Sequence, residues 1–128
     1  MGLLLDTHSF IWWVDDAPTL SPIARQRIAD ETQVCFVSIA SAWEMAIKAS
    51  LGKLRLTMPV RRYVQEQVLA NGFRLLHLSL DHVTRVETLP MHHRDPFDRL
   101  LIAQAEIERL DLVSVDTRFD DYGVTRIW

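Results

Sequence analysis

Short apolar runs alternate with helix-forming stretches along almost the whole chain of 128 residues. Residues 2–5 (GLLL) and 34–37 (VCFV) form continuous apolar runs, which is the pattern of a strand buried on both faces. Shorter or mixed runs follow at 74–78, 112–115 and 124–128. Parallel strands need helix-length crossover connections, whereas antiparallel strands can be joined by tight turns. The sequence therefore predicts an α/β fold, with a mainly parallel sheet between two layers of helices.

Several helix boundaries are marked by residues that prefer helix ends. Ser21-Pro22 and Asp95-Pro96 each combine a capping side chain with a proline that fits the first helical position. Gly52 and Gly72 follow two further predicted helices, because glycine readily adopts the left-handed conformation that ends many helices. At this length we expect a single domain, residues 1–128.

Acidic residues stand where parallel α/β sheets bind their ligands, which is outside the carboxyl ends of the strands. Asp6 directly follows the first apolar run, and Asp116 follows the fourth. Asp98 falls in the first turn of the helix that begins at Pro96. Each acid alone has an ordinary explanation, since the helix dipole favours Asp98 and turns favour Asp116. We expect no basic residue to pair with either of these two acids.

Glu44 is the fourth candidate acid. It lies at the margin of the apolar face predicted for the helix 39–51. At this margin Glu44 can form a surface ion pair with Lys48, four residues later, or it can line a cleft. The spacing alone leaves both alternatives open.

Four carboxylates in one pocket need a compensating cation. Two carboxylates about 5 Å apart repel by roughly 3 kcal/mol at an effective dielectric constant of 20. Carboxylate oxygens, without cysteine and without histidines at a helical ligand spacing, suit Mg²⁺ or Mn²⁺ better than zinc. Mg²⁺ retains much of its water, which leaves positions for a phosphate oxygen and a nucleophilic water. If the acids converge, the predicted reaction is metal-assisted hydrolysis of a phosphodiester.

Composition limits the partners and the compartment. A net charge of −3 argues against binding nucleic acid through bulk electrostatics, so the basic segment 53–62 is the best candidate for a phosphate-contacting rim. The single cysteine, Cys35, lies in an apolar run and indicates a buried thiol in a reducing, cytoplasmic protein. No apolar run approaches the ~20 residues of a membrane span, and the N-terminus lacks a signal-peptide pattern. We therefore expect a cytoplasmic protein without a membrane partner.

Four segments of the chain, in order, resemble the PIN-domain ribonucleases of the VapC toxin type. They are Leu3–His8 (LLLDTH), Ser38–Lys48 (SIASAWEMAIK) with Leu51–Leu54 (LGKL), His93–Ala105 (HRDPFDRLLIAQA), and Val115-Asp116 with Tyr122–Val124 (YGV). The resemblance covers essentially the whole chain. It implies a three-layer α/β/α sandwich with a mainly parallel five-stranded sheet in the order 3-2-1-4-5. It also implies a Mg²⁺-dependent endoribonuclease that forms a homodimer and is neutralised by a cognate VapB-type antitoxin.

The resemblance also implies roles for individual residues. Asp6 and Asp98 are expected to bind the metal (Mg²⁺, with Mn²⁺ as an alternative) directly. Asp116 is expected to bind it directly or through water, and Glu44 is expected to orient metal-bound water. All four are therefore expected to be catalytic. Thr7 and Ser38 are expected to support these ligands by hydrogen bonds.

Other classes of protein fit less well. A phosphoacceptor receiver domain, the signalling alternative, needs a lysine at the end of a late strand, and none stands there. A haloacid-dehalogenase-type phosphatase needs a second Asp two residues after the first, where His8 stands. A non-catalytic PIN-like binding module stays open, because the sequence shows the acids but not their geometry. The loop histidines His92 and His93 are expected to have no function.

Overall fold

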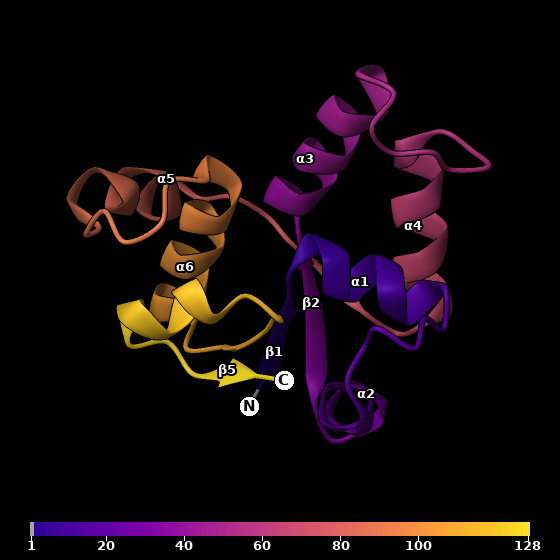
Figure 1. Ribbon diagram of the computed structural model, residues 1–128, viewed down its shortest axis with the longest axis horizontal. Helices are drawn as coiled ribbons and strands as arrows, with labels where there is room; N and C mark the ends of the chain where they lie inside the picture. The colour runs from indigo at the N-terminus through magenta and orange to yellow at the C-terminus, as the bar shows by residue number, and fades with distance from the viewer. Residues whose placement is uncertain (1) are drawn as a thin grey trace.

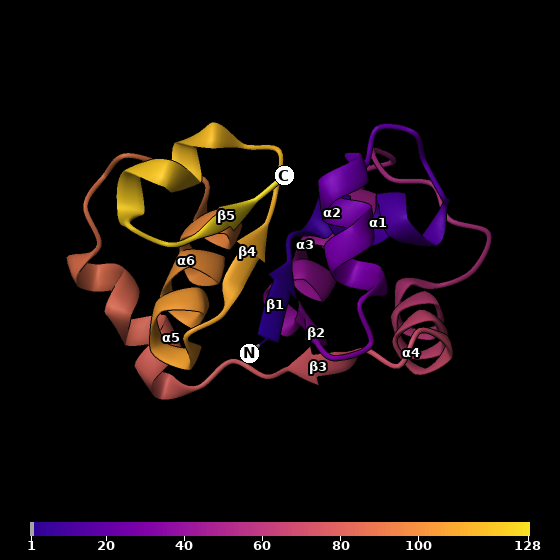
Figure 2. The same cartoon turned by 90° about the horizontal axis from the view of Figure 1, so that it is seen from below.

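Five parallel strands form one sheet at the centre of the computed structural model, which describes residues 2–128. The strands are β1 (Gly2–Leu5), β2 (Val34–Ser38), β3 (Arg74–Leu76), β4 (Asp111–Val113) and β5 (Arg126–Ile127). Their order in the sheet is β3-β2-β1-β4-β5, and every neighbouring pair is parallel. The predicted fold class and strand order are therefore confirmed. Figure 2 shows the strands in this order, with β1 in the middle.

Helices connect the strands and cover the sheet. They are α1 (Thr7–Val14), α2 (Pro22–Ala29), α3 (Ile39–Ser50), α4 (Val60–Ala70), α5 (Leu80–Arg85) and α6 (Pro96–Glu108), with the 3-10 helices η1 (Val86–Thr88) and η2 (Thr117–Tyr122). In Figures 1 and 2, α5 and α6 lie on one side of β1, whereas α1, α2 and α4 lie on the other. None of the helices in residues 2–128 combines the length and apolar character that crossing a membrane requires.

Alternate residues of β1 face two separate hydrophobic cores. Leu3 and Leu5 pack with buried residues of α1 to α4, including Phe10. Leu4 points to the opposite face and packs with buried residues of α6 and with Phe119 of η2. All three leucines are fully buried, and each contributes about 2 kcal/mol of hydrophobic stabilisation. Strand β1 is therefore a firmly anchored base for the acid that follows it, Asp6.

The local signals in the sequence set most element boundaries. The side chains of Ser21 and Asp95 accept hydrogen bonds from the first turns of α2 and α6, and each is followed by a proline. Gly52 ends the turn after α3 with a φ of 71°, a conformation that costs most other residues energy. At the start of α1 the capping side chain is that of Asp6, which accepts a hydrogen bond from the Ser9 backbone at 2.8 Å.

Three strands are shorter than the sequence predicts. Strand β3 ends at Leu76 rather than at residue 78, and β5 covers only Arg126–Ile127 of the run 124–128. The apolar run 112–115 predicts a strand to Val115, but β4 ends at Val113, because its neighbour β5 pairs over only two residues. Asp116 is therefore not the last residue of a strand but the N-cap of η2. It still lies at the carboxyl edge of the sheet, next to Asp6, whose backbone N–H donates to the Val113 carbonyl.

Candidate active site

The four acids predicted from the sequence line one cleft at the carboxyl edge of the sheet. The cleft has a volume of about 380 Å³ and is lined by Asp6, Thr7, His8, Glu44, Lys48, Asp95, Asp98, Val115, Asp116 and Arg118. A larger cavity of about 530 Å³ lies near the amino ends of β2 and β3. Its two acids, Asp30 and Glu31, are exposed and belong to one loop, so they do not form a comparable cluster.

Asp6 and Asp98 are the acids whose charges are least compensated. Asp6 is 7% exposed, and burial raises the pKa of its carboxyl against the opposing effect of hydrogen bonds from Ser9 and Ser114. Burial also raises the pKa of Asp98, to about 8, and repulsion from the neighbouring acids adds to the shift. Within residues 2–128, neither carboxylate forms an ion pair with a lysine or arginine. Both sites therefore favour a proton or another cation.

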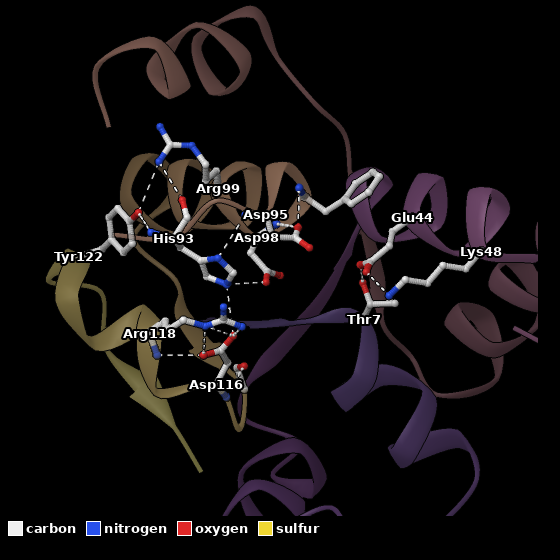
Figure 3. A network of polar contacts seen from close by, with 12 residues as sticks. Thr7, Glu44, Lys48, His93, Asp95, Asp98, Arg99, Asp116, Arg118 and Tyr122 are labelled. Carbon is white, nitrogen blue, oxygen red and sulfur yellow. Dashed lines mark hydrogen bonds and ion pairs between the residues drawn. The ribbon is translucent and has the colours of Figure 1, made fainter. Parts of the chain in front are cut away.

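Glu44 is held by partners on both of its carboxylate oxygens. The Thr7 hydroxyl donates a hydrogen bond to Oε1 at 2.6 Å, and the Lys48 ammonium donates to Oε2 at 2.6 Å. Glu44 is 6% exposed, and Figure 3 shows the three side chains together on one side of the site. The two alternatives from the sequence are thus both realised, since Glu44 pairs with Lys48 and also lines the cleft.

Asp116 has a strong cationic partner, contrary to the sequence-based expectation. Arg118 donates from Nη2 to Oδ2 at 2.8 Å and from Nε to Oδ1 at 3.0 Å. The hydrogen bond from Arg118 lowers the pKa of Asp116 to about 2. Arg99 directly follows Asp98 but does not line the cleft. The expectation that no lysine or arginine pairs with these two acids is therefore wrong for Asp116 and not for Asp98.

His93 contacts two of the acids, which the sequence did not predict. Its Nε2 lies 2.8 Å from Asp98 Oδ2 and 3.2 Å from Asp116 Oδ2. Its Nδ1 accepts a hydrogen bond from the Asp95 backbone N–H, so the proton of a neutral ring belongs on Nε2, facing the acids. The only signal in the sequence is its position two residues before a helix cap.

Arg99 fixes the loop that carries His93. It is 6% exposed, and its guanidinium donates to four backbone carbonyls, those of Val86, Leu89, Pro90 and His93. Figure 3 shows the contacts of Arg99 with the His93 carbonyl and with the Tyr122 hydroxyl, which also accepts a hydrogen bond from the His93 backbone N–H. A buried guanidinium so fully hydrogen-bonded is a fixed anchor for the segment between η1 and α6.

Ser38 and the predicted basic rim lie away from the acids. The Ser38 hydroxyl caps α3 and donates to Gln104 on α6, and it contacts none of the four acids by a hydrogen bond. The segment 53–62 contributes no residue to the cleft, and its Arg62 is paired with Glu66. The cations that line the cleft are instead Lys48 and Arg118.

The donor set fits a hard divalent cation. Carboxylate oxygens predominate, and no cysteine lines the cleft. The ligand atoms of His93, Asp98 and Asp116 lie within 4.8 Å of one another, which is close enough for one ion. Because Nε2 of a neutral His93 carries the proton, the histidine fits better as a donor to the acids than as a ligand. Asp98 belongs to this group, and Asp6 lines the same cleft without a lysine or arginine partner in residues 2–128.

A parallel sheet in this order, with acids at its carboxyl edge, matches a known class of domain. The family model described as the PIN domain matches residues 3–124, and the chain belongs to that family. Within it, the chain is similar to Ribonuclease VapC22 of Mycobacterium tuberculosis, with 33% identity over 120 residues that cover 91% of this chain and 88% of the relative.

Solved structures show the same fold. The crystal structure of VapBC2 from Rickettsia felis, bound to a DNA fragment from their promoter, contains a chain that matches with a TM-score of 0.72 and 12% identity. That match covers 98% of this chain and 97% of the other. VapBC-1 from nontypeable Haemophilus influenzae matches with a TM-score of 0.63 and 16% identity, over 98% and 96% of the two chains.

Proposed function

We propose that this chain is an endoribonuclease that depends on Mg²⁺ or Mn²⁺ and acts as the toxin of a type II toxin–antitoxin pair. The observation that carries the proposal is the pair Asp6 and Asp98. Asp6 is buried and Asp98 is half-buried. Both carboxylates have a raised pKa and no lysine or arginine partner in residues 2–128, and they share the cleft with Glu44 and Asp116. Such a pair costs folding energy unless a cation binds between them. The name of the relative VapC22, a ribonuclease, supports RNA as the substrate.

Each acid of the cleft would have its own role in metal binding and hydrolysis. A bound Mg²⁺ or Mn²⁺ would polarise the phosphoryl group and supply a nucleophilic water. Asp6 and Asp98 would hold the ion directly, because their oxygens have the fewest competing partners. Asp116 would act through water, since Arg118 already occupies both of its oxygens. Glu44, fixed by Thr7 and Lys48, would orient a water without being displaced.

The proposed partners are a VapB-type antitoxin and a second copy of the chain. Three similar structures are described as VapBC or toxin–antitoxin complexes, from Rickettsia felis, Haemophilus influenzae and Klebsiella pneumoniae. This supports the predicted antitoxin. The homodimer and the cytoplasmic location stay predictions from the sequence.

Cleavage of total RNA by the purified protein tests the catalytic part. We expect cleavage with Mg²⁺ or Mn²⁺, none with EDTA, and none with Asp6→Asn or Asp98→Asn in either metal. Asp81→Asn is the matched control, because Asp81 is an exposed acid in the first turn of α5. Cleavage that persists in Asp98→Asn removes this residue from the mechanism, and a wild type inactive with both metals overturns the proposal.

Expression in a bacterial host tests the toxin role. Induction of the wild type should stop growth, and the product of an adjacent reading frame should restore it. Asp98→Asn should be harmless. If the wild type is harmless although it cleaves RNA in vitro, the toxin role is wrong and the nuclease remains.

A further inference from the structure

Two cations face the cleft, and two of the four acids hold them in place. Lys48 of α3 is paired with Glu44 at 2.6 Å, and Arg118 of η2 is paired with Asp116 at 2.8 Å. Both cations line the cleft. In Figure 3 they lie on opposite sides of Asp98. The acidic site is therefore flanked by positive charge on two sides.

Both cations keep hydrogen-bond donors that their acids do not use. A lysine ammonium has three N–H donors, and the only hydrogen bond of the Lys48 ammonium within residues 2–128 is the one to Glu44. Arg118 uses Nε and Nη2 on Asp116, which leaves both protons of Nη1 free. The side chains are 38% and 62% exposed, so a ligand in the cleft can reach these free donors.

The ion pairs with Glu44 and Asp116 hold the Lys48 and Arg118 side chains at the cleft. A free lysine or arginine on a surface samples many rotamers, at a cost of up to about 2 kcal/mol when it is fixed by a ligand. Glu44 is itself clamped by Thr7, and Asp116 also accepts hydrogen bonds from the Arg118 backbone and from His93. Each cation is thus held in advance by an acid that cannot move freely.

We infer that Lys48 and Arg118 bind the RNA backbone, each contacting a phosphate on its own side of the Asp6 and Asp98 pair. This inference rests on the proposed function, because it takes single-stranded RNA as the substrate. It also gives Glu44 and Asp116 a second task beside the ones proposed above. They hold the two cations that contact the RNA backbone.

The salt dependence of binding measures such contacts directly. Each phosphate contact by a lysine or arginine contributes about 0.7 to the slope of log K against log salt for a single strand. Loss of one contact therefore weakens binding about fivefold at 0.1 M salt, and the difference vanishes towards 1 M. A residue that only supports the fold or the metal site leaves the slope unchanged.

The experiment compares Lys48→Met and Arg118→Met with the wild type. The probe is a fluorescein-labelled RNA oligonucleotide of randomised sequence, and its fluorescence anisotropy is followed at several salt concentrations in EDTA. Arg74→Met is the matched control, because Arg74 is an exposed cation at the amino end of β3, away from the cleft. We expect each cleft variant to have a slope shallower by about 0.7, and the control to match the wild type.

A second variant separates direct contact from net charge. Glu44→Gln combined with Lys48→Met removes an acid and a base together, so the charge of the cleft stays the same. If Lys48 contacts a phosphate, this pair keeps the shallow slope of Lys48→Met. A return to the wild-type slope means that only net charge matters and overturns the inference for Lys48. Wild-type slopes in both single variants overturn it altogether, and a change in only one overturns it for the other residue.

The outcome is independent of the proposed catalysis. Binding is measured in EDTA, in which no cleavage is expected, so the slopes do not depend on cleavage. If the wild type cleaves no RNA with either metal, the proposed function fails, while the slopes still decide whether Lys48 and Arg118 grip a phosphate backbone.

Discussion

Replacement of Asp98 by Asn should make the metal-free protein more stable. Burial and the neighbouring acids raise the pKa of Asp98 from 3.8 to about 8, so the folded state binds this proton more tightly than the unfolded state. The wild type therefore loses stability as the pH rises between about 4 and 8. An asparagine carries no charge, and its amide oxygen can still accept the hydrogen bond from His93. The variant is thus free of this pH-dependent cost.

The size of the effect follows from the pKa values. Above pH 4 the unfolded wild type is ionised at Asp98 while the folded state keeps the proton, which costs about 1.4 kcal/mol for each pH unit. At pH 7 the sum is about 4 kcal/mol in favour of Asp98→Asn. The side chain of Asp98 is 22% exposed, so solvent screens only part of this cost. Mg²⁺ at about 100 times its dissociation constant raises the free energy of unfolding of the wild type by about 3 kcal/mol, and it does not stabilise the variant.

Urea unfolding in EDTA, followed by tryptophan fluorescence, measures this difference between about pH 5 and pH 8. The advantage of Asp98→Asn should grow with pH in EDTA and shrink or reverse in Mg²⁺. Asp81→Asn controls for the loss of an acid from the first turn of a helix, and it should show neither trend. An advantage that does not change with pH, or a variant less stable than the wild type in EDTA, refutes the reasoning.

Three further substitutions test other contacts of the site. Arg118→Met removes the partner that lowers the pKa of Asp116 to about 2, so an NMR titration should show this pKa shifted upward, and the stability that Asp116 gives above about pH 4 should shrink. Arg99→Met removes the buried guanidinium that donates to four backbone carbonyls and should lower the free energy of unfolding by about 3 kcal/mol, whereas a loss below about 1 kcal/mol contradicts the anchoring role. Glu44→Gln should slow RNA cleavage by about 10- to 100-fold without abolishing it, because Glu44 is proposed to orient water rather than bind the metal; a complete loss, as for Asp98→Asn, assigns it to the ligands.

The fold was accessible from the sequence because its signals are local. The leucines of β1 and the caps Ser21 and Asp95 act within a few residues of their own position, and the structure keeps them. The end of β4 was predicted two residues too late, because strand length depends on the neighbouring strand. Val115 is apolar, but β5 offers it no partner, and it is 45% exposed.

The sequence predicts where the acids lie, but it does not predict the residues that contact them. Asp6 and Asp98 have positions fixed by a strand end and a helix start, which the chain order places at the same edge of the sheet. His93 and Arg118 depend on the paths of a loop and a 3-10 helix, which no periodic pattern describes. The sequence could therefore give the negative charges of the site, but not the histidine that joins them or the arginine that compensates one of them.

Anomalous diffraction from a crystal soaked in Mn²⁺ tests the central proposal most directly. The account predicts a peak in the cleft within about 2.2 Å of carboxylate oxygens of both Asp6 and Asp98, a typical length for a bond from carboxylate oxygen to a small divalent ion. The same soak of Asp98→Asn crystals should give no peak there. A peak that contacts neither residue, or no peak in wild-type crystals that diffract well, would contradict it.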